Sequence, residues 1–145
     1  MPTTPSMSFE PALIRLDPVM NQRYVTMMNV ALNAPSAGTL AYSKGQILAE
    51  YSASASAGTY GIYASTGSGG LNIPKGILQY SCTVDSSGNI AIYGEFSQTQ
   101  RGVPMYMPGM AVWRVADLVG FDSNALTVMG GAYVEGSSAG GLVQI

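Results

Sequence analysis

Histidine is absent from this 145-residue chain. Its absence removes the commonest general base, the usual partner of a nucleophilic serine or cysteine, and the commonest metal ligand. Cysteine occurs once, as Cys82, so an internal disulfide cannot form and a disulfide-stapled secreted fold is excluded. A single cysteine inside an apolar run is expected to be a small core residue. Most hydrolase classes are therefore excluded, and a reducing compartment is compatible with the sequence.

Charge is also scarce. Asp, Glu, Lys and Arg make up 10% of the chain, whereas about 25% is usual. The formal net charge is −2 and the six basic residues are dispersed, which argues against nucleic acid because phosphate binding depends on clustered Lys and Arg. No apolar run approaches about 18 residues, and the start MPTTPSMSFEP lacks the basic and apolar regions of a signal peptide. We expect no nucleic-acid partner, no membrane partner and no export.

The residues that are abundant favour β-structure. Hydrophobic residues make up 47% of the chain, and 18 Gly and 8 Pro interrupt it too often for a helical bundle. The prolines gather at the start, as Pro2, Pro5, Pro11, Pro18 and Pro35. The sequence therefore predicts a mixed α+β, predominantly β fold: a compact small-sheet domain over residues 36–145 with one or two short helices, preceded by an extended N-terminal arm over residues 1–35.

Short runs of β-branched and aromatic residues, separated by Gly and Ser, predict strands from residue 24 onward. The expected strands are Tyr24–Val30, Gln46–Tyr51, Tyr60–Ala64, Ile77–Val84, Ile90–Phe96, Met110–Val115, Ala132–Glu135 and Leu142–Ile145. Turn-forming residues over 85–89 predict a hairpin. Asp122 is the expected N-cap of a helix over SNALTVM, which Gly130 or Gly131 would close, and Ala116–Leu118 is expected to form a further turn.

Few residue patterns are typical of a catalytic site. The string 136–140 matches the G-x-S-x-G motif of a nucleophile elbow, but no histidine can activate Ser138 and no helix follows. We interpret it as a loop of small residues. The eight carboxylates show no metal-ligand spacing, so we expect no metal, no cofactor and no catalytic residue. A small enzyme acting through Asp117 or Glu95 stays open as a third hypothesis, because tertiary structure can bring carboxylates together.

The segment VPMYMPGMAVW combines thioethers and aromatic rings, which pack well against irregular apolar partners. Its candidate interface residues are Met105, Tyr106, Met107, Met110 and Trp113. One interpretation is a subunit interface, because a domain with so few charges exposes more apolar surface than a monomer normally does. The other is a proline-pinned loop that covers the core. Both interpretations stay open.

The order of several short motifs resembles the lambda-type head decoration proteins of tailed phages. The resemblance covers about residues 38–145. Its motifs are KGQIL at 44–48, the Gly-Thr-Tyr step at 58–60, Gly-Ile-Leu at 76–78, Tyr-Gly-Glu-Phe at 93–96, DLVGFD at 117–122 and the glycine pair at 130–131. Each motif is common in β-proteins, and only their order is characteristic of the family.

The resemblance implies a non-enzymatic structural protein of the virion. Family members act as capsid cement: they bind the outer surface of the expanded bacteriophage head as a homotrimer at three-fold positions. There they stabilise the capsid against internal DNA pressure. The implied partners are the major capsid protein and two further copies of the chain, and the implied location is the outer capsid surface, after synthesis in the host cytoplasm. The longer arm and the segment over 97–110 depart from the short family members.

The resemblance also implies that the arm attaches the protein to the head. An extended arm can add to an exposed sheet edge while its apolar side chains fill pockets, and three linked copies multiply a modest affinity. The expected capsid-binding residues are Phe9, Leu13, Ile14 and Leu16. The alternative is another virion β-domain, such as a tail or fibre component, that binds host glycans through exposed Tyr60, Tyr63 and Trp113.

Overall fold

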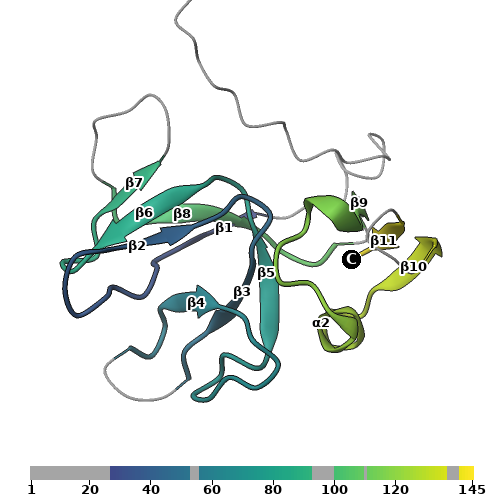
Figure 1. The fold of residues 1–145 in the computed structure, drawn as a ribbon, viewed down its shortest axis with the longest axis horizontal. Coiled ribbons are helices and arrows are strands. Elements are labelled where there is room, and N and C mark those ends of the chain that lie inside the picture. The colour runs from purple at the N-terminus through teal and green to yellow at the C-terminus, as the bar shows by residue number, and fades with distance from the viewer. Residues whose placement is uncertain (1–26, 53–55, 93–99, 110, 137–140) are drawn as a thin grey trace, which may run out of the picture.

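The structure is a computed structural model that describes residues 27–52, 56–92, 100–109, 111–136 and 141–145 (Figure 1). It confirms a mixed, predominantly β fold with short helices. The strands are β1 (Met27–Val30), β2 (Thr39–Tyr42), β3 (Ile47–Glu50), β4 (Tyr60–Ile62), β5 (Pro74–Leu78), β6 (Cys82–Asp85), β7 (Ile90–Ile92), β8 (Val103–Tyr106), β9 (Val112–Arg114), β10 (Ala132–Glu135) and β11 (Leu142–Gln144). The helices are a 3-10 turn, η1 (Val115–Asp117), and α2 (Ser123–Val128).

The strands form three small antiparallel sheets. One sheet has five strands in the order β1-β8-β5-β3-β4, and the other two have three strands each, in the orders β2-β6-β7 and β10-β11-β9. Figure 1 shows the β2-β6-β7 sheet on the left and the β10-β11-β9 sheet with α2 on the right. The five-stranded sheet lies between them, so the interior is divided into two parts.

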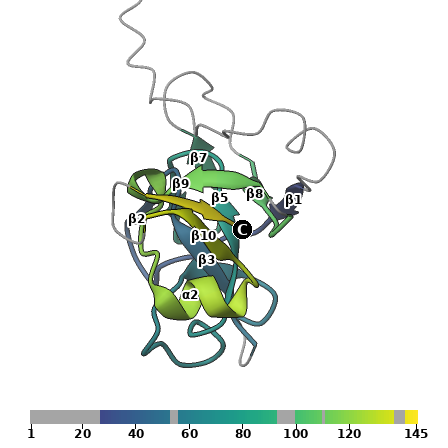
Figure 2. The same ribbon diagram turned by 90° about the vertical axis from the view of Figure 1, so that its right-hand side faces the viewer.

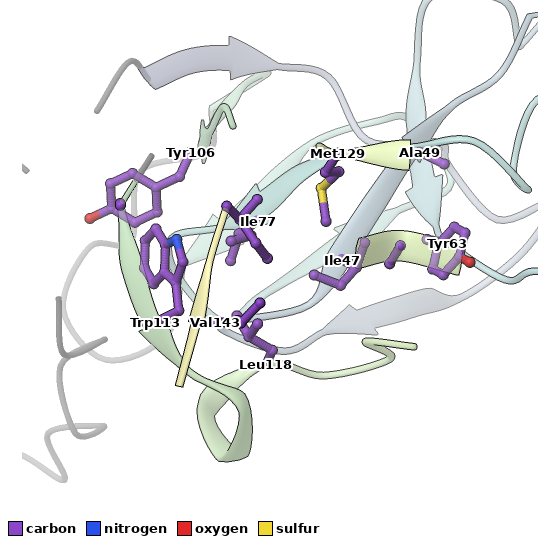
Figure 3. Close-up of a cluster of buried hydrophobic side chains, with 12 residues drawn as sticks. Ile47, Ala49, Tyr63, Ile77, Tyr106, Trp113, Leu118, Met129 and Val143 are labelled. Carbon is purple, nitrogen blue, oxygen red and sulfur yellow. The ribbon is translucent and has the colours of Figure 1, made fainter. Parts of the chain in front are cut away.

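The neighbouring strands β3 and β5, both inside the five-stranded sheet, contribute side chains to both parts of the interior. Successive side chains of a strand point to opposite faces. Accordingly Ile47 and Ile77 belong to one buried cluster, whereas Leu48 and Leu78 belong to the other. The first cluster lies against the β10-β11-β9 sheet and α2, as Figure 3 shows for several of its side chains. Burial on both faces explains why the first three residues of β3, Ile47–Ala49, are apolar without alternation.

Local sequence signals place the hairpin and the helix as predicted. β6 and β7 pair antiparallel across residues 85–89, where the Asp85 carboxylate accepts hydrogen bonds from the backbone N–H groups of Ser87 and Asn89 at 2.9 Å. Asp122 caps α2, because its Oδ1 accepts from the N–H of Ala125 at 2.8 Å. Gly130 follows the helix with a φ of 70°, which favours glycine.

The expected strand over Ile77–Val84 is wrong, because the chain bends between β5 and β6. Ser81, at the end of this bend, is buried, and its hydroxyl accepts a hydrogen bond from the N–H of Lys44 at 2.8 Å.

The strands β2 and β8 were not expected. β8 contains Pro104, which has no backbone N–H. The carbonyl of Pro104 accepts a hydrogen bond from the N–H of Gln79 at 3.1 Å. The side of Pro104 that lacks the N–H therefore faces the chain beyond Leu78, where β5 has ended and no strand partner needs that donor.

The expected strand over Tyr24–Val30 is confirmed for Met27–Val30 as β1, which lies within the range predicted as an arm. β1 pairs with β8, with Met27 opposite Tyr106 and Val30 opposite Val103. Val30 and Leu32 are buried in the second cluster. Residues 27–32 therefore belong to the folded domain, and residues 1–26 lie outside the described residues.

Candidate functional site

The carboxylate considered for catalysis forms a surface ion pair. Asp117 accepts two hydrogen bonds from the guanidinium of Arg114, at 2.9 Å from Nε and 3.1 Å from Nη2. This bidentate arrangement joins the end of β9 to η1 and occupies both carboxylate oxygens. Glu95 and Ser138 lie outside the described residues. In the part of the chain that the structure describes, no three His, Cys, Asp or Glu side chains come together as a metal site requires.

The hydroxyl of Tyr63, just after β4, connects to the N-terminal end of α2 through hydrogen bonds. The Tyr63 hydroxyl donates to Oδ1 of Asp122 at 2.8 Å and accepts from Nδ2 of Asn124 at 2.8 Å. Burial raises the pKa of Tyr63, while the hydrogen bond from Asn124 lowers it and the hydrogen bond to Asp122 raises it. The phenol therefore stays protonated at neutral pH and connects residues 59 positions apart. This arrangement positions the helix and leaves Asp122 engaged as a cap.

The titratable groups in the second cluster are held in their neutral forms. Burial raises the pKa of the Cys82 thiol to about 12, and its side chain is fully enclosed, which confirms that Cys82 is a core residue. Burial likewise raises the pKa of Tyr42. Burial also raises the pKa of Tyr60, with the charge of Glu50 and a hydrogen bond to it adding to the effect. Because a thiol reacts as the thiolate, Cys82 is not a nucleophile at neutral pH.

The aromatic side chains considered for glycan binding point inward. Tyr60, Tyr63 and Trp113 are all buried in the structure. Figure 3 shows Tyr63 and Trp113 among the apolar side chains of the first cluster. Carbohydrate stacking needs an accessible ring face, which these three residues do not present. The described residues therefore offer no support for a glycan platform built on them.

The methionine-rich segment belongs mainly to the interior. Met105 is fully buried in the second cluster. The ring centroids of Tyr106 and Trp113 lie 5.2 Å apart, and both side chains are buried in the first cluster. Figure 3 shows the two rings side by side. Met107 is half-buried against the second cluster, and Met110 lies outside the described residues. Met105, Tyr106 and Trp113, proposed as part of a subunit interface, are thus covered by their own chain.

Exposed apolar side chains occur instead at several places, including two outer strands. β1 is an edge of the five-stranded sheet, and Met27 and Met28 are 53% and 42% exposed there. β10 is an edge of the β10-β11-β9 sheet, and each of its residues is exposed, including Val134 at 55%. Tyr133 of β10 lies edge-on to Phe121, with ring centroids 6.4 Å apart. β1 and β10 therefore both offer apolar groups to a partner.

The β10-β11-β9 sheet has an inner and an outer face. Trp113 of β9 and Val143 of β11 are register partners and point into the first cluster. Their neighbours along the strands, which alternate to the other face, are half-buried, namely Val112, Arg114, Leu142 and Gln144. At one end of this sheet lies a hollow lined in part by Ala132 and Gln144.

Sequence analysis did not identify this region as a site. Its strands were expected, but their order was not, because β11 pairs both with the nearby β10 and with the distant β9. The pattern of β10 offered one signal, because AYVE carries apolar residues at adjacent positions and so cannot bury all of them on one face. The expected capsid-binding residues Phe9, Leu13, Ile14 and Leu16 lie outside the described residues.

Comparison with known proteins found no match among protein-family models, curated proteins or solved structures. The resemblance to the phage decoration proteins therefore stays a prediction. Among the helices of the described residues, none is long and apolar enough to cross a membrane.

Proposed function

We propose that the chain is a non-enzymatic capsid decoration protein. It binds the outer surface of the expanded head as a homotrimer at three-fold positions and cements neighbouring copies of the major capsid protein against internal DNA pressure. The proposal assigns no catalytic residue, cofactor or metal, and no nucleic-acid or membrane partner. The proposal started from the order of motifs over residues 38–145. The position of β1 and the exposed apolar side chains of the domain support it.

The observation that carries the proposal is the position of β1. This strand is an edge of the five-stranded sheet, it exposes Met27 and Met28, and it directly follows the proline-containing segment 1–26. An edge strand presents backbone donors and acceptors for pairing with another chain. The segment before it supplies Phe9, Leu13, Ile14 and Leu16, an apolar set suited to pockets beside an added strand.

The two alternatives have less support. The alternative, a tail or fibre component, was expected to bind host glycans through exposed Tyr60, Tyr63 and Trp113, and these rings are buried. The enzyme hypothesis named Asp117 or Glu95; Asp117 is held by Arg114, and Glu95 lies outside the described residues. A surface of exposed apolar side chains with few charges is typical of a protein that binds other proteins.

Co-sedimentation with undecorated heads of the cognate major capsid protein tests the proposal. The variant should lack residues 2–20, because β1 begins at Met27 and a deletion that continued past residue 26 would remove part of the sheet. We expect saturable binding of the full chain to expanded heads, no binding to unexpanded heads, and weaker binding of the shortened chain. The physical reason is that the arm supplies a large share of the apolar contact in each of three linked copies.

A matched pair of point variants controls for the length of the arm. The fourfold variant Phe9→Ser, Leu13→Ser, Ile14→Ser and Leu16→Ser should bind as weakly as the shortened chain. A second variant with Thr3→Ser, Thr4→Ser and Ser6→Thr keeps the apolar set and should bind like the natural chain. Absence of binding by the full chain to either form of the head would overturn the decoration role and favour a tail or fibre component.

A further inference from the structure

Lys75 and Glu135 differ from most charged residues of the described chain because they have no partner within it. Other charged side chains form a hydrogen bond or ion pair with their own chain, among them Glu50, Asp85, Arg101, Arg114, Asp117 and Asp122. Lys75 and Glu135 are exposed, and neither side chain has a hydrogen bond or ion pair to any other residue that the structure describes. In a chain of which only 10% is charged, one cation and one anion thus stay available to a partner.

Both charged residues lie at irregular places in their strands. In β5, a register shift against β3 leaves Lys75 without a Cα partner on that strand. In β10, a register shift against β11 does the same for Val134, the neighbour of Glu135. An extra residue in one strand bends that strand and re-aims the side chains around it. Local backbone geometry therefore accounts for the exposure of Lys75 and Val134.

Exposed apolar side chains accompany each charge. Ile73, two positions before Lys75, is 46% exposed, and we call these two residues the Lys75 surface. Tyr133 and Val134, directly before Glu135, are also exposed, and we call these three residues the Glu135 surface. Figure 1 shows β10 at the right-hand end of the molecule, and Figure 2 looks onto that end, with β10 and α2 in front. Both surfaces combine apolar groups with a single charge, and the two charges are opposite.

We propose that the Glu135 surface of one copy of the chain packs against the Lys75 surface of a second copy, with the carboxylate of Glu135 beside the ammonium of Lys75. The occupant is a second copy because the chain itself supplies both halves of a charge-complementary contact. Opposite charges fix the partner and its orientation, while the burial of Ile73, Tyr133 and Val134 supplies affinity.

This inference rests on the proposed function, because it specifies how the copies in the homotrimer contact one another. Two different surfaces meet, so each copy turns its Glu135 surface toward one neighbour and its Lys75 surface toward the other. Contacts of this head-to-tail kind form a ring when the rotation between copies closes. In the closed trimer, each copy has both charges paired. A contact between two Glu135 surfaces would instead bring two like charges together.

Carbodiimide cross-linking of the free full-length protein tests the contact directly. The reagent joins a carboxylate to an adjacent amine as an amide, and the oxygen that the carboxylate loses leaves on the urea formed from the reagent. We expect peptide maps of the covalent products, which should extend to the trimer, to show Lys75 joined to Glu135. A mixture of unlabelled and isotope-labelled chains should show that the two residues come from different copies. Lys75→Arg keeps the positive charge but lacks the reactive amine, so this control should stay trimeric and lose the cross-link.

Charge reversal gives a second readout. Glu135→Lys and Lys75→Glu each place like charges opposite one another, so each should raise the concentration at which the trimer dissociates by about tenfold or more. The combined variant restores opposite charges in exchanged places and should dissociate within about threefold of the natural concentration. Ala91→Lys, at an exposed alanine of β7, is the matched control and should leave dissociation unchanged. Sedimentation velocity over a series of protein concentrations measures these changes.

Failure of this contact and failure of the proposed function give different results. A natural trimer that yields no cross-link of Lys75 to Glu135 between copies, or that neither charge reversal weakens, would overturn the contact but not the homotrimer. A combined variant that dissociates as readily as the weaker single variant would also overturn the contact. A natural chain that is monomeric at every concentration would overturn the contact and the homotrimer together, whereas binding to heads is measured separately by co-sedimentation.

Discussion

At the scale of single residues, Asp122 shows how far local sequence leads. Its role as an N-cap follows from its position before an apolar run, and the structure confirms the hydrogen bond to Ala125. Its second contact, with the hydroxyl of Tyr63, was not predictable, because the two residues are 59 positions apart and only the fold brings them together. The capping motif is local in sequence, whereas the tyrosine contact is tertiary.

Replacing Asp122 by Ala should lower the free energy of unfolding by about 1–2 kcal/mol, because the N-terminus of α2 and the buried Tyr63 hydroxyl both lose an acceptor. Denaturant unfolding followed by circular dichroism measures this loss. Asp122→Asn keeps an oxygen at the same position and should lose less. Equal stability of Asp122→Ala and the natural protein would contradict the assigned role.

Asp85 should make the free energy of unfolding depend on pH in the acidic range. The pKa of this carboxyl lies below its ordinary value of 3.8, mainly because the carboxylate accepts a hydrogen bond from the backbone N–H of Asn89. A lowered folded-state pKa contributes stability that is complete above the unfolded value and is lost as the pH falls through the folded value. The stability difference between the natural protein and Asp85→Asn should therefore be constant above about pH 5 and shrink below it.

Urea unfolding at a series of pH values, with both proteins measured side by side, checks this behaviour. The amide introduced by Asp85→Asn does not titrate, so the variant removes only the carboxyl in question. A difference that stays the same from about pH 5 to about pH 2 would show that the carboxylate of Asp85 has no folded-state advantage.

At the scale of elements, strand existence was more predictable than strand limits. Runs of β-branched and aromatic residues located β1, β3, β4, β7, β9, β10 and β11, because such side chains suit a pleated surface. The break between β5 and β6 was missed because most of the stretch is apolar, and a tertiary hydrogen bond to Ser81 holds the bend. β8 was missed because Pro104 indicates a loop when its neighbours in the sheet are unknown.

In β5, Gly76 leaves almost no space for a side chain. A Cβ there would be 2.5 Å from the carbonyl oxygen of Tyr106 and 2.8 Å from Cγ of Met105. Gly76→Ala should therefore force β5 and β8 apart and lower the free energy of unfolding by about 1–3 kcal/mol. Chemical denaturation measures the change, and Lys75→Ala, at an exposed neighbour on the same strand, is the control. Unfolding of Gly76→Ala at the natural denaturant midpoint would argue against this packing.

At the scale of the whole molecule, sequence composition predicted the class of fold but not the location of the apolar surface. Few charges indicated an apolar exterior, and the candidate was the segment rich in methionine. The structure turns Met105, Tyr106 and Trp113 inward and leaves exposed apolar groups on β1 and β10. The prediction of the apolar surface failed because sheet pairing decides which face of a strand is covered. The local periodicity of a sequence does not show which distant strands pair.

The proposed role predicts that the free protein is a homotrimer. Exposed apolar side chains on two outer strands, together with few charges, favour association, because burying them removes apolar surface from water. Native mass spectrometry should give three times the mass of the chain. Met28→Asp combined with Val134→Asp should shift the distribution toward the monomer, whereas Ala91→Asp should not. A monomer at every concentration tested would contradict the trimeric assembly.

The most direct measurement of the central claim is the temperature at which DNA leaves filled heads. Undecorated DNA-filled heads would be heated with a dye that fluoresces on released DNA, with and without a saturating amount of the protein. The account predicts release at a clearly higher temperature when the protein is bound, and an intermediate temperature with the fourfold arm variant at the same concentration. Release at the same temperature, with the full chain bound at saturation, would show that the protein binds the head without cementing it and would contradict the account.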